Sequence, residues 1–228
     1  MALICFDLDG TLVDPLRAIS YCAGHTFREF GLAEPSVEEL APCVGFGAGE
    51  IFALHPSFKD PARLDAALEI YWAHFAESGI VKHRVYDGVP MLLARLKRQG
   101  HKLYVVTVKP TRYAKQVLHQ FDLLLAFDEV FGTSPKEPWR SKSDVLAGLR
   151  AQGVLQAEGF LVGDRTDDMA SAKAHGLVPL GVTYGFGSAL ELEAAGAKAL
   201  FGSPAELDAW FKLKLTDPER HDAFTRSE

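Results

Sequence analysis

The sequence predicts an α/β fold with a parallel sheet and a long helical segment inserted after the first strand. From about residue 87 onward, short apolar runs alternate with segments of helical periodicity, the pattern of βαβ units. An earlier apolar run, Leu3–Phe6, has the composition of a strand buried on both faces. Residues 15–84, which follow it, have only helical patterns. Because one strand precedes this stretch and several follow it, the stretch is an insertion and not a separate N-terminal domain.

The inserted stretch has clear helix start and stop signals. Asp14-Pro15 indicates the start of one helix and Gly31 its end. Asp60-Pro61 starts another helix, and Ser36 with Glu39 forms a capping-box pattern between the two. Apolar residues recur at helical spacing along both helices, and we assign them to a core: Leu16, Ile19, Ala23, Phe27, Phe30, Leu64, Leu68, Tyr71, Trp72 and Phe75.

The elements after the insert follow from the same signals. The predicted elements are a helix at 89–99, a strand at 103–106, a helix at 111–121, a strand near 130–131, a helix at 141–151, a strand at 160–162, a helix at 169–175, and strands at 178–182 and 199–201. Ser188 with Glu191 and Ser203 with Glu206 open two more helices. The predicted organisation has three parts: a core of 1–14 and 85–215, a helical insert of 15–84, and a polar tail of 216–228.

Composition excludes several classes of protein. The 228 residues are 48% apolar and 24% charged, which is typical of a globular protein and not of a disordered chain. The net charge is −6 without a basic run, so we expect no nucleic-acid partner. Three cysteines without a C-x-x-C pattern indicate reduced thiols, and the apolar stretch Met1–Phe6 is too short for a signal peptide or a membrane span. We expect a cytoplasmic protein without membrane contact, as a monomer or homodimer.

Polar residues follow the predicted strands at their carboxyl ends. Asp7 and Asp9 follow the first strand, Thr107 follows the strand at 103–106, and Asp164 follows the strand at 160–162. The loop before Lys142, which lies at the start of the helix at 141–151, is a further candidate. Ligands of open parallel sheets bind at this edge, at the point where the strand order switches. If the strands are adjacent, these side chains meet in one small volume.

Carboxylates that meet in this way repel one another unless a cation lies among them. An all-oxygen set without histidine or cysteine suits Mg²⁺ better than Zn²⁺. A metal ion and a lysine would neutralise phosphoryl oxygens, while a threonine hydroxyl and loop N–H groups would orient them. Gly10 allows the backbone to approach such a ligand closely. The residue types therefore predict phosphate chemistry with Mg²⁺ as the cofactor.

This pattern resembles the haloacid dehalogenase-like hydrolase superfamily. Four segments match its motifs in order: Asp7-Leu8-Asp9-Gly10-Thr11-Leu12, Val105-Val106-Thr107, Lys142 within 140–146, and Gly163-Asp164-Arg165-Thr166-Asp167-Asp168. The helical insert, Lys109-Pro110 and residues 181–188 look like the phosphoglycolate phosphatase branch. The resemblance implies a Rossmann-like three-layer core with an inserted all-helical cap. Val108 departs from the branch, which usually has Asn there, so a side-chain contact to phosphate is lost.

The resemblance also implies roles for the acidic residues. Asp7 would attack phosphorus and form an aspartyl-phosphate, and Asp9 would act as general acid and then as general base. The Asp7 carboxylate, the Asp9 main-chain carbonyl and the Asp164 carboxylate would bind Mg²⁺. Asp168 would hold the metal shell or Lys142 in place. Asp167 is the alternative to Asp168, which the spacing favours.

For the phosphoryl group, the resemblance implies contacts with Gly10, Thr107 and Lys142, and Lys136 is the alternative to Lys142. The cap would close on the substrate through the glycine-rich loop at Gly45, Phe46 and Gly47, which is otherwise an ordinary turn between helices. The segments 12–14 and 84–87 would then be the hinges. The eight histidines are scattered, and we assign them to the surface or the core.

The function expected from the resemblance is hydrolysis of a small phosphate ester, such as phosphoglycolate. The phosphoglycolate carboxylate would need a cation from the cap, for which the candidates are Arg17, Lys59, Arg63, Lys82 and Arg84. A 5′-nucleotidase, a pyrophosphatase and a phosphosugar mutase remain alternatives.

Other chemistries fit less well. A dehalogenase does not need Asp9, and a phosphonate hydrolase needs a lysine on the first cap helix, where residues 15–30 have none. A signalling receiver places its aspartate on a middle strand, and a catalytically silent binding protein is possible only if these residues fail to assemble.

Overall fold

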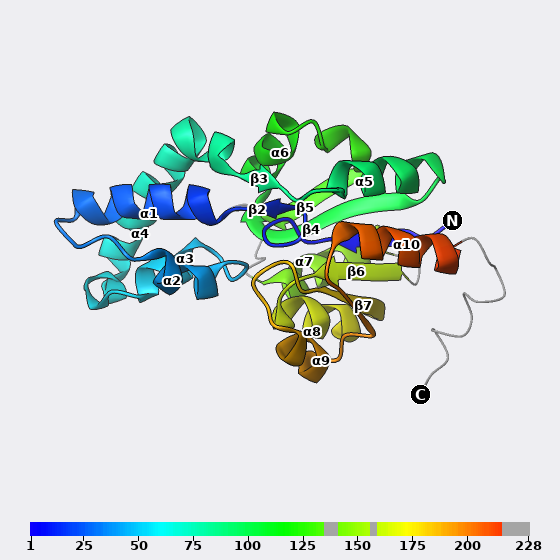
Figure 1. The fold of residues 1–228 in the computed structure, drawn as a ribbon. Coiled ribbons are helices and arrows are strands. Elements are labelled where there is room, and N and C mark those ends of the chain that lie inside the picture. Colours follow the sequence, from blue (N-terminus) through cyan, green and yellow to red (C-terminus); the bar gives the residue numbers. More distant parts are fainter. Residues whose placement is uncertain (135–140, 156–158, 216–228) are drawn as a thin grey trace.

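A computed structural model describes residues 1–134, 141–155 and 159–215. Six parallel strands form the central sheet in the order β5-β4-β1-β6-β7-β8 (Figure 1). The strands are β1 (Leu3–Phe6), β4 (Lys102–Pro110), β5 (Glu129–Thr133), β6 (Gly159–Gly163), β7 (Leu177–Val182) and β8 (Ala199–Phe201). The first strand of the chain therefore lies in the middle, where the strand order reverses direction. This is the switch point at which open α/β sheets bind ligands.

Alternating residues of β1 face two separate hydrophobic cores. Ile4 and Phe6 belong to the larger core, whereas Leu3 and Cys5 belong to the smaller one. This alternation follows from the pleat of the strand, which turns successive side chains to opposite faces. Both faces are apolar because both are covered by helices, as the continuous apolar run indicated.

Helices cover both faces of the sheet and make a three-layer core (Figure 1). On one face lie α5 (Val89–Arg98), α6 (Thr111–Gln120) and α10 (Pro204–Leu215), which contribute to the larger core. On the other face lie α7 (Lys142–Ala151), α8 (Thr166–Ala174) and α9 (Ala189–Ala195). The predicted α/β class and the three-layer arrangement are confirmed.

The helical insert lies beyond the end of the sheet (Figure 1). Its α-helices are α1 (Leu16–Glu29), α2 (Val37–Leu40), α3 (Ala48–Ala53) and α4 (Pro61–His74). Phe27, Phe52, Phe58 and Tyr71 form an aromatic cluster between them, with ring centroids 5.1–5.9 Å apart in its contacting pairs. The insert thus has an apolar centre of its own, although its residues are continuous with the larger core.

Two short strands that link the sheet to the insert were not predicted. Val13–Asp14 (β2) pairs antiparallel with Arg84–Val85 (β3), so that the two chain crossings between the sheet and the insert form a short ribbon. Arg84, expected in a wholly helical stretch, is therefore in a strand. Two-residue strands are too short to show a period in the sequence.

The other predicted strands and helices are present, with shifts of a few residues at their ends. The strand expected at 103–106 is longer, and the helix expected at 169–175 starts at Thr166. The predicted polar tail at 216–228 lies outside the described residues. Within the described part of the chain, every helix is too short or too polar to cross a membrane.

Truncation of Phe52 should destabilise the protein through the aromatic cluster of the insert. Its side chain is fully buried, and Phe52→Ala should lower the free energy of unfolding by about 3–5 kcal/mol in urea denaturation. The control is Leu125→Ala, because Leu125 is 92% exposed and its truncation should cost less than about 0.5 kcal/mol. Equal effects of the two substitutions would contradict the packing described here.

Candidate active site

The strand register brings the residues after β1, β4 and β6 together. Phe6 is the partner of Val105 on one side and of Val162 on the other. The Asp7 N–H donates to the Val162 carbonyl at 2.8 Å, so the chain continues along the sheet for one residue after β1. Asp7 therefore lies between the ends of β4 and β6. The order of the strands in the sheet thus brings their carboxyl ends together, as predicted.

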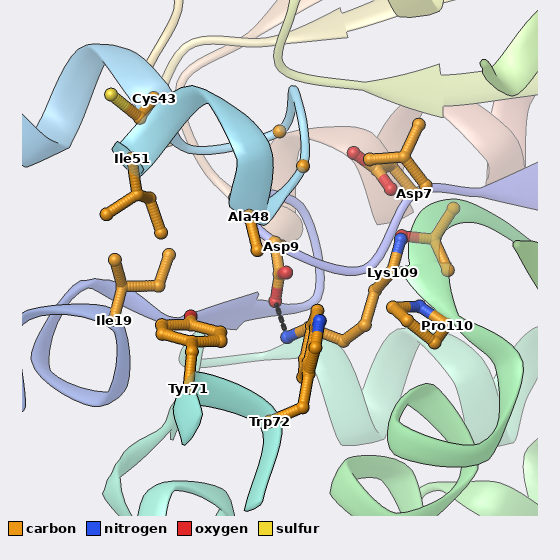
Figure 2. A pocket seen from close by; sticks show the side chains of 14 residues that line it. Asp7, Asp9, Ile19, Cys43, Ala48, Ile51, Tyr71, Trp72, Lys109 and Pro110 are labelled. Atoms are coloured by element: carbon orange, nitrogen blue, oxygen red, sulfur yellow. Dashed lines mark hydrogen bonds and ion pairs between the residues drawn. The ribbon is translucent and has the colours of Figure 1, made fainter. Parts of the chain in front are cut away.

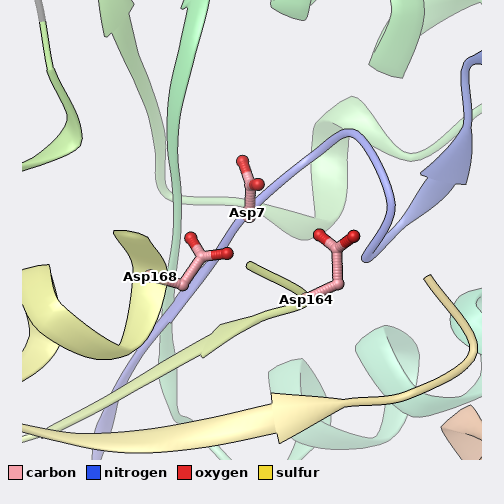
Figure 3. A group of neighbouring side chains, drawn as sticks. All are labelled: Asp7, Asp164 and Asp168. Carbon is pink, nitrogen blue, oxygen red and sulfur yellow. The ribbon is translucent and has the colours of Figure 1, made fainter. Parts of the chain in front are cut away.

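Three buried aspartates form a cluster at this edge (Figure 3). Each of Asp7, Asp164 and Asp168 offers a carboxylate oxygen, and these oxygens lie within 4.8 Å of one another. Burial raises the pKa of Asp7 and raises that of Asp164 well above its usual range, and neighbouring carboxylates add to both shifts. Burial also raises the pKa of Asp168 to about 6, although Lys142 opposes this shift. Without a further cation, this arrangement of anions is unfavourable.

Lys142 is the cation that the fold places beside the cluster. It is the first residue of α7, whose start is fixed by a capping box between Ser141 and Asp144. Its Nζ lies 3.0 Å from Asp7 Oδ2 and also donates to Asp168 Oδ1. Burial alone would lower the pKa of Lys142, but Asp168 and Asp7 raise it above its usual value.

The charges and the donor atoms fit a divalent metal ion. Three carboxylates and one ammonium leave two negative charges in a buried volume, which a divalent cation would neutralise. All ligand atoms that the cluster offers are oxygens, the donors that Mg²⁺ prefers. The donor set thus agrees with the predicted cofactor.

Backbone groups fix the position of Asp164. Its Oδ2 accepts a hydrogen bond from the Phe186 N–H at 2.8 Å. Gly10, with a φ of +86°, passes so close that a Cβ at this position would lie 2.2 Å from the same oxygen. Only glycine combines this dihedral angle with this close approach. Gly10 therefore lies at the predicted site, against the carboxylate.

Asp9 lies apart from the three-aspartate cluster and has a cation of its own. Its Oδ1 accepts a hydrogen bond from Lys109 Nζ at 2.7 Å (Figure 2). The same Nζ lies 3.2 Å from His83 Nε2. All three side chains are buried. Lys109 was noted only as part of the resemblance, and His83 was assigned to the surface or the core, so both were missed as neighbours of Asp9.

A pocket separates the strand ends from the helical insert (Figure 2). The residues that line it from the core side are Asp7, Asp9, Thr107, Val108, Lys109 and Pro110. The insert contributes Ile19, Cys43, Gly45, Gly47, Ala48, Ile51, Tyr71 and Trp72. Tyr71 and Trp72, expected only in the core, thus also face the pocket. The pocket has an anionic floor and a lining from the insert that is mostly apolar.

The predicted cap loop divides into residues that line the pocket and one that does not. Gly45 and Gly47 line it, whereas Phe46 packs under Arg165, whose guanidinium lies 4.5 Å from the ring centroid. Arg165 donates to the Pro42 carbonyl at 2.7 Å and to the Phe186 carbonyl at 3.0 Å. It therefore joins the insert to the sheet edge. Its position inside the fourth motif was the only signal for it.

Thr107 is buried at the pocket, and its Oγ1 accepts a hydrogen bond from the Lys109 N–H at 3.2 Å. Asp167 does not belong to the aspartate cluster, so the geometry selects Asp168 of the two alternatives. Lys136, the alternative to Lys142, lies outside the described residues.

The candidate cations Arg17, Lys82 and Arg84 line a different cleft, beside the β2–β3 ribbon. Arg63 lies over the Phe30 ring, 4.8 Å from its centroid.

Comparisons with known proteins agree with this arrangement. The family model of the haloacid dehalogenase-like hydrolases matches residues 4–182. A 5′-nucleotidase of Pseudomonas aeruginosa is 33% identical over 84% of this chain and 86% of its own length. A phosphoglycolate phosphatase of Aquifex aeolicus is 31% identical over 77% of this chain and 82% of its own.

Among solved structures, one described as "a predicted phosphatase" from Clostridium acetobutylicum superposes with a TM-score of 0.84. It is 32% identical, and the match covers 93% of this chain and 98% of that one. The family match spans both the four motifs and the helical insert. This chain therefore belongs to the haloacid dehalogenase-like hydrolases and is a phosphatase of that family.

Proposed function

We propose that the protein hydrolyses small phosphate monoesters with Mg²⁺ as cofactor, through an aspartyl-phosphate on Asp7. The observation that supports this most strongly is the environment of Asp7. It is the one residue that belongs to the aspartate cluster, contacts Lys142 and lines the pocket, among the residues that the structure describes. A nucleophile for phosphorus needs this combination of a metal site, a cation and access to substrate.

In this proposal the Asp7 and Asp164 carboxylates and the Asp9 main-chain carbonyl would hold Mg²⁺. When bound, the ion would neutralise phosphoryl oxygens and so favour attack by an anionic nucleophile. Asp168 remains with Lys142 and keeps its ammonium beside Asp7. Lys142 and the Thr107 hydroxyl then contact the transferring phosphoryl group, with Gly10 allowing its close approach.

The chain's own residues act in two half-reactions. An Asp7 oxygen attacks phosphorus as the bond to the leaving oxygen breaks, and Asp9 gives a proton to that oxygen. Asp9, now a carboxylate, takes a proton from the water that attacks the aspartyl-phosphate. Phosphate leaves, and Asp7 returns to a carboxylate. One carboxyl group serves both steps because its protonation alternates.

We propose that the helical insert is a cap, with the core of 1–14 and 85–215 as its partner. The pocket volume is about 40 Å³, room for a few water molecules. Entry of a whole ester therefore requires the insert to open. Such motion would be resisted by the β2–β3 ribbon and by the contacts of Arg165 with Pro42 and Phe46.

The lining of the pocket supports an uncharged leaving group. Among the described lining residues, the insert offers no cation, and Lys109 is already paired with Asp9. A carboxylate such as that of phosphoglycolate would have to be desolvated without a partner of its own, which is unfavourable. The same argument applies to pyrophosphate. A nucleoside monophosphate or a neutral sugar phosphate fits better, and a 5′-nucleotidase is among the relatives.

Replacement of Asp7 should abolish turnover. With p-nitrophenyl phosphate, the wild type should require Mg²⁺, and Asp7→Asn should lower kcat by at least about 10⁴-fold because the nucleophile is lost. The control is Asp65→Asn, an equal change at an exposed position of α4, which should leave turnover unchanged. Acid quenching followed by peptide mass spectrometry should locate phosphate on Asp7. Turnover that survives in Asp7→Asn would refute the proposed nucleophile.

A matched pair of substrates tests the leaving-group proposal. Phosphoglycolate and 2-hydroxyethyl phosphate differ only by a carboxylate in place of a hydroxymethyl group. We expect kcat/KM to be roughly tenfold or more higher for the neutral ester, equivalent to about 1.4 kcal/mol. Assay of both with a nucleoside monophosphate, a sugar phosphate and pyrophosphate would rank the alternatives. A preference for phosphoglycolate would mean that a cation reaches its carboxylate.

A further inference from the structure

The Asp9 carboxyl is held by a chain of buried contacts that the mechanism above does not use. Lys109 Nζ lies 2.7 Å from Asp9 Oδ1 and 3.2 Å from His83 Nε2. Lys109 is 6% exposed and His83 5% exposed. A lysine ammonium with so little water around it must find its partners in the protein. Here those partners are one carboxylate, one imidazole and the Phe75 ring, whose centroid lies 5.1 Å from Nζ.

The hydrogen bonds of His83 define its protonation. Its Nδ1 lies 3.0 Å from the Ile80 carbonyl, which can only accept, so Nδ1 carries the proton. The Lys109 ammonium has only donors to offer, so Nε2 accepts a hydrogen bond from it and the ring is neutral. Phe75 packs edge-to-face on the ring, with centroids 5.5 Å apart, and limits its motion.

These contacts join two segments that are far apart in the sequence, and His83 lies outside the four motifs. His83 immediately precedes β3, in the chain crossing from the helical insert to the sheet. Lys109 is near the end of β4, two residues after Thr107. Lys109, in the sheet, thus orients the Asp9 side chain directly. His83, in the linker of the insert, orients it through Lys109.

We propose that Lys109 is a positioning residue for the general acid and base Asp9, and that His83 holds Lys109 in place. This inference rests on the proposed function. Oδ1 is engaged by the ammonium, so Oδ2 is the oxygen that carries the exchanged proton. When that proton passes to the leaving oxygen, the bond to phosphorus breaks and Asp9 becomes a carboxylate. The Lys109 ammonium stabilises this new anion.

The dependence of rate on the leaving group distinguishes this role from a structural one. A poor leaving group, such as an alkoxide, needs the proton from Asp9, whereas p-nitrophenolate leaves without it. The experiment measures kcat/KM for p-nitrophenyl phosphate and for 2-hydroxyethyl phosphate with each variant. This constant reports the steps up to departure of the leaving group.

The variants are Lys109→Met, which removes the charge at similar size, and the pair His83→Leu and His83→Gln. We expect Lys109→Met to lower kcat/KM for the alkyl ester by about 10²-fold or more. The factor by which kcat/KM falls for the aryl ester should be at least tenfold smaller. His83→Leu should show the same selective loss in milder form. His83→Gln should restore the alkyl-ester rate, because its amide oxygen can accept from Lys109. Lys115→Met, which removes an exposed lysine paired with Glu129 at 2.7 Å, is the matched control and should affect neither substrate.

Equal losses on both esters in Lys109→Met and His83→Leu would overturn the inference. So would an alkyl-ester rate in His83→Gln no better than in His83→Leu. If Lys109→Met fails to fold, the two His83 variants decide alone, since p-nitrophenyl phosphate turnover reports their fold. Asp9→Asn separates this inference from the proposed function. If Asp9→Asn loses rate selectively on the alkyl ester and Lys109→Met does not, only the positioning role of Lys109 is refuted. If Asp9→Asn shows no selective loss, the role of Asp9 as general acid is itself refuted.

Discussion

Three carboxylates in one buried volume are the constraint on which the rest of this structure depends. Burial raises the pKa of Asp7, Asp164 and Asp168, and a neighbouring carboxylate adds to each shift. Lys142 offsets part of the repulsion, and the remainder is unfavourable unless a divalent cation is present. Such local conflict is the mark of a functional site, because a sequence selected only for stability would not place these residues together.

The fold makes this conflict possible with few long-range features. The first strand, β1, lies in the middle of the sheet between β4 and β6. Asp7 and Asp9, which follow β1, therefore lie beside the ends of these two strands. Helices α7 and α8 bring Lys142 and Asp168 at their first turns. The helical insert covers the same edge and supplies an apolar lining. This apolar cover lowers the effective dielectric constant around the charged groups and so strengthens the electrostatic interactions inside the pocket.

The parts of the site that could be predicted are those with a local signal. Asp7, Asp9 and Asp164 each follow a short apolar strand, and Lys142 follows a helix-start signal, so spacing along the chain placed them. His83 and Arg165 act through contacts with distant segments, and no period or cap marks them. The β2–β3 ribbon was missed for a related reason, since two-residue strands form only when their partner lies alongside. The contact of Phe46 with Arg165 was likewise not predicted, because it joins segments that are far apart in the sequence.

Calorimetric titration of the protein with Mg²⁺ is the sharpest check on the aspartate cluster, because it needs no substrate. We expect the wild type to bind a single ion and Asp164→Asn to lose this binding. Asp167→Asn is the matched comparison, since it removes a neighbouring carboxylate outside the cluster and should bind as the wild type does. Absence of binding to the wild type, or equal binding by Asp164→Asn, would contradict the account.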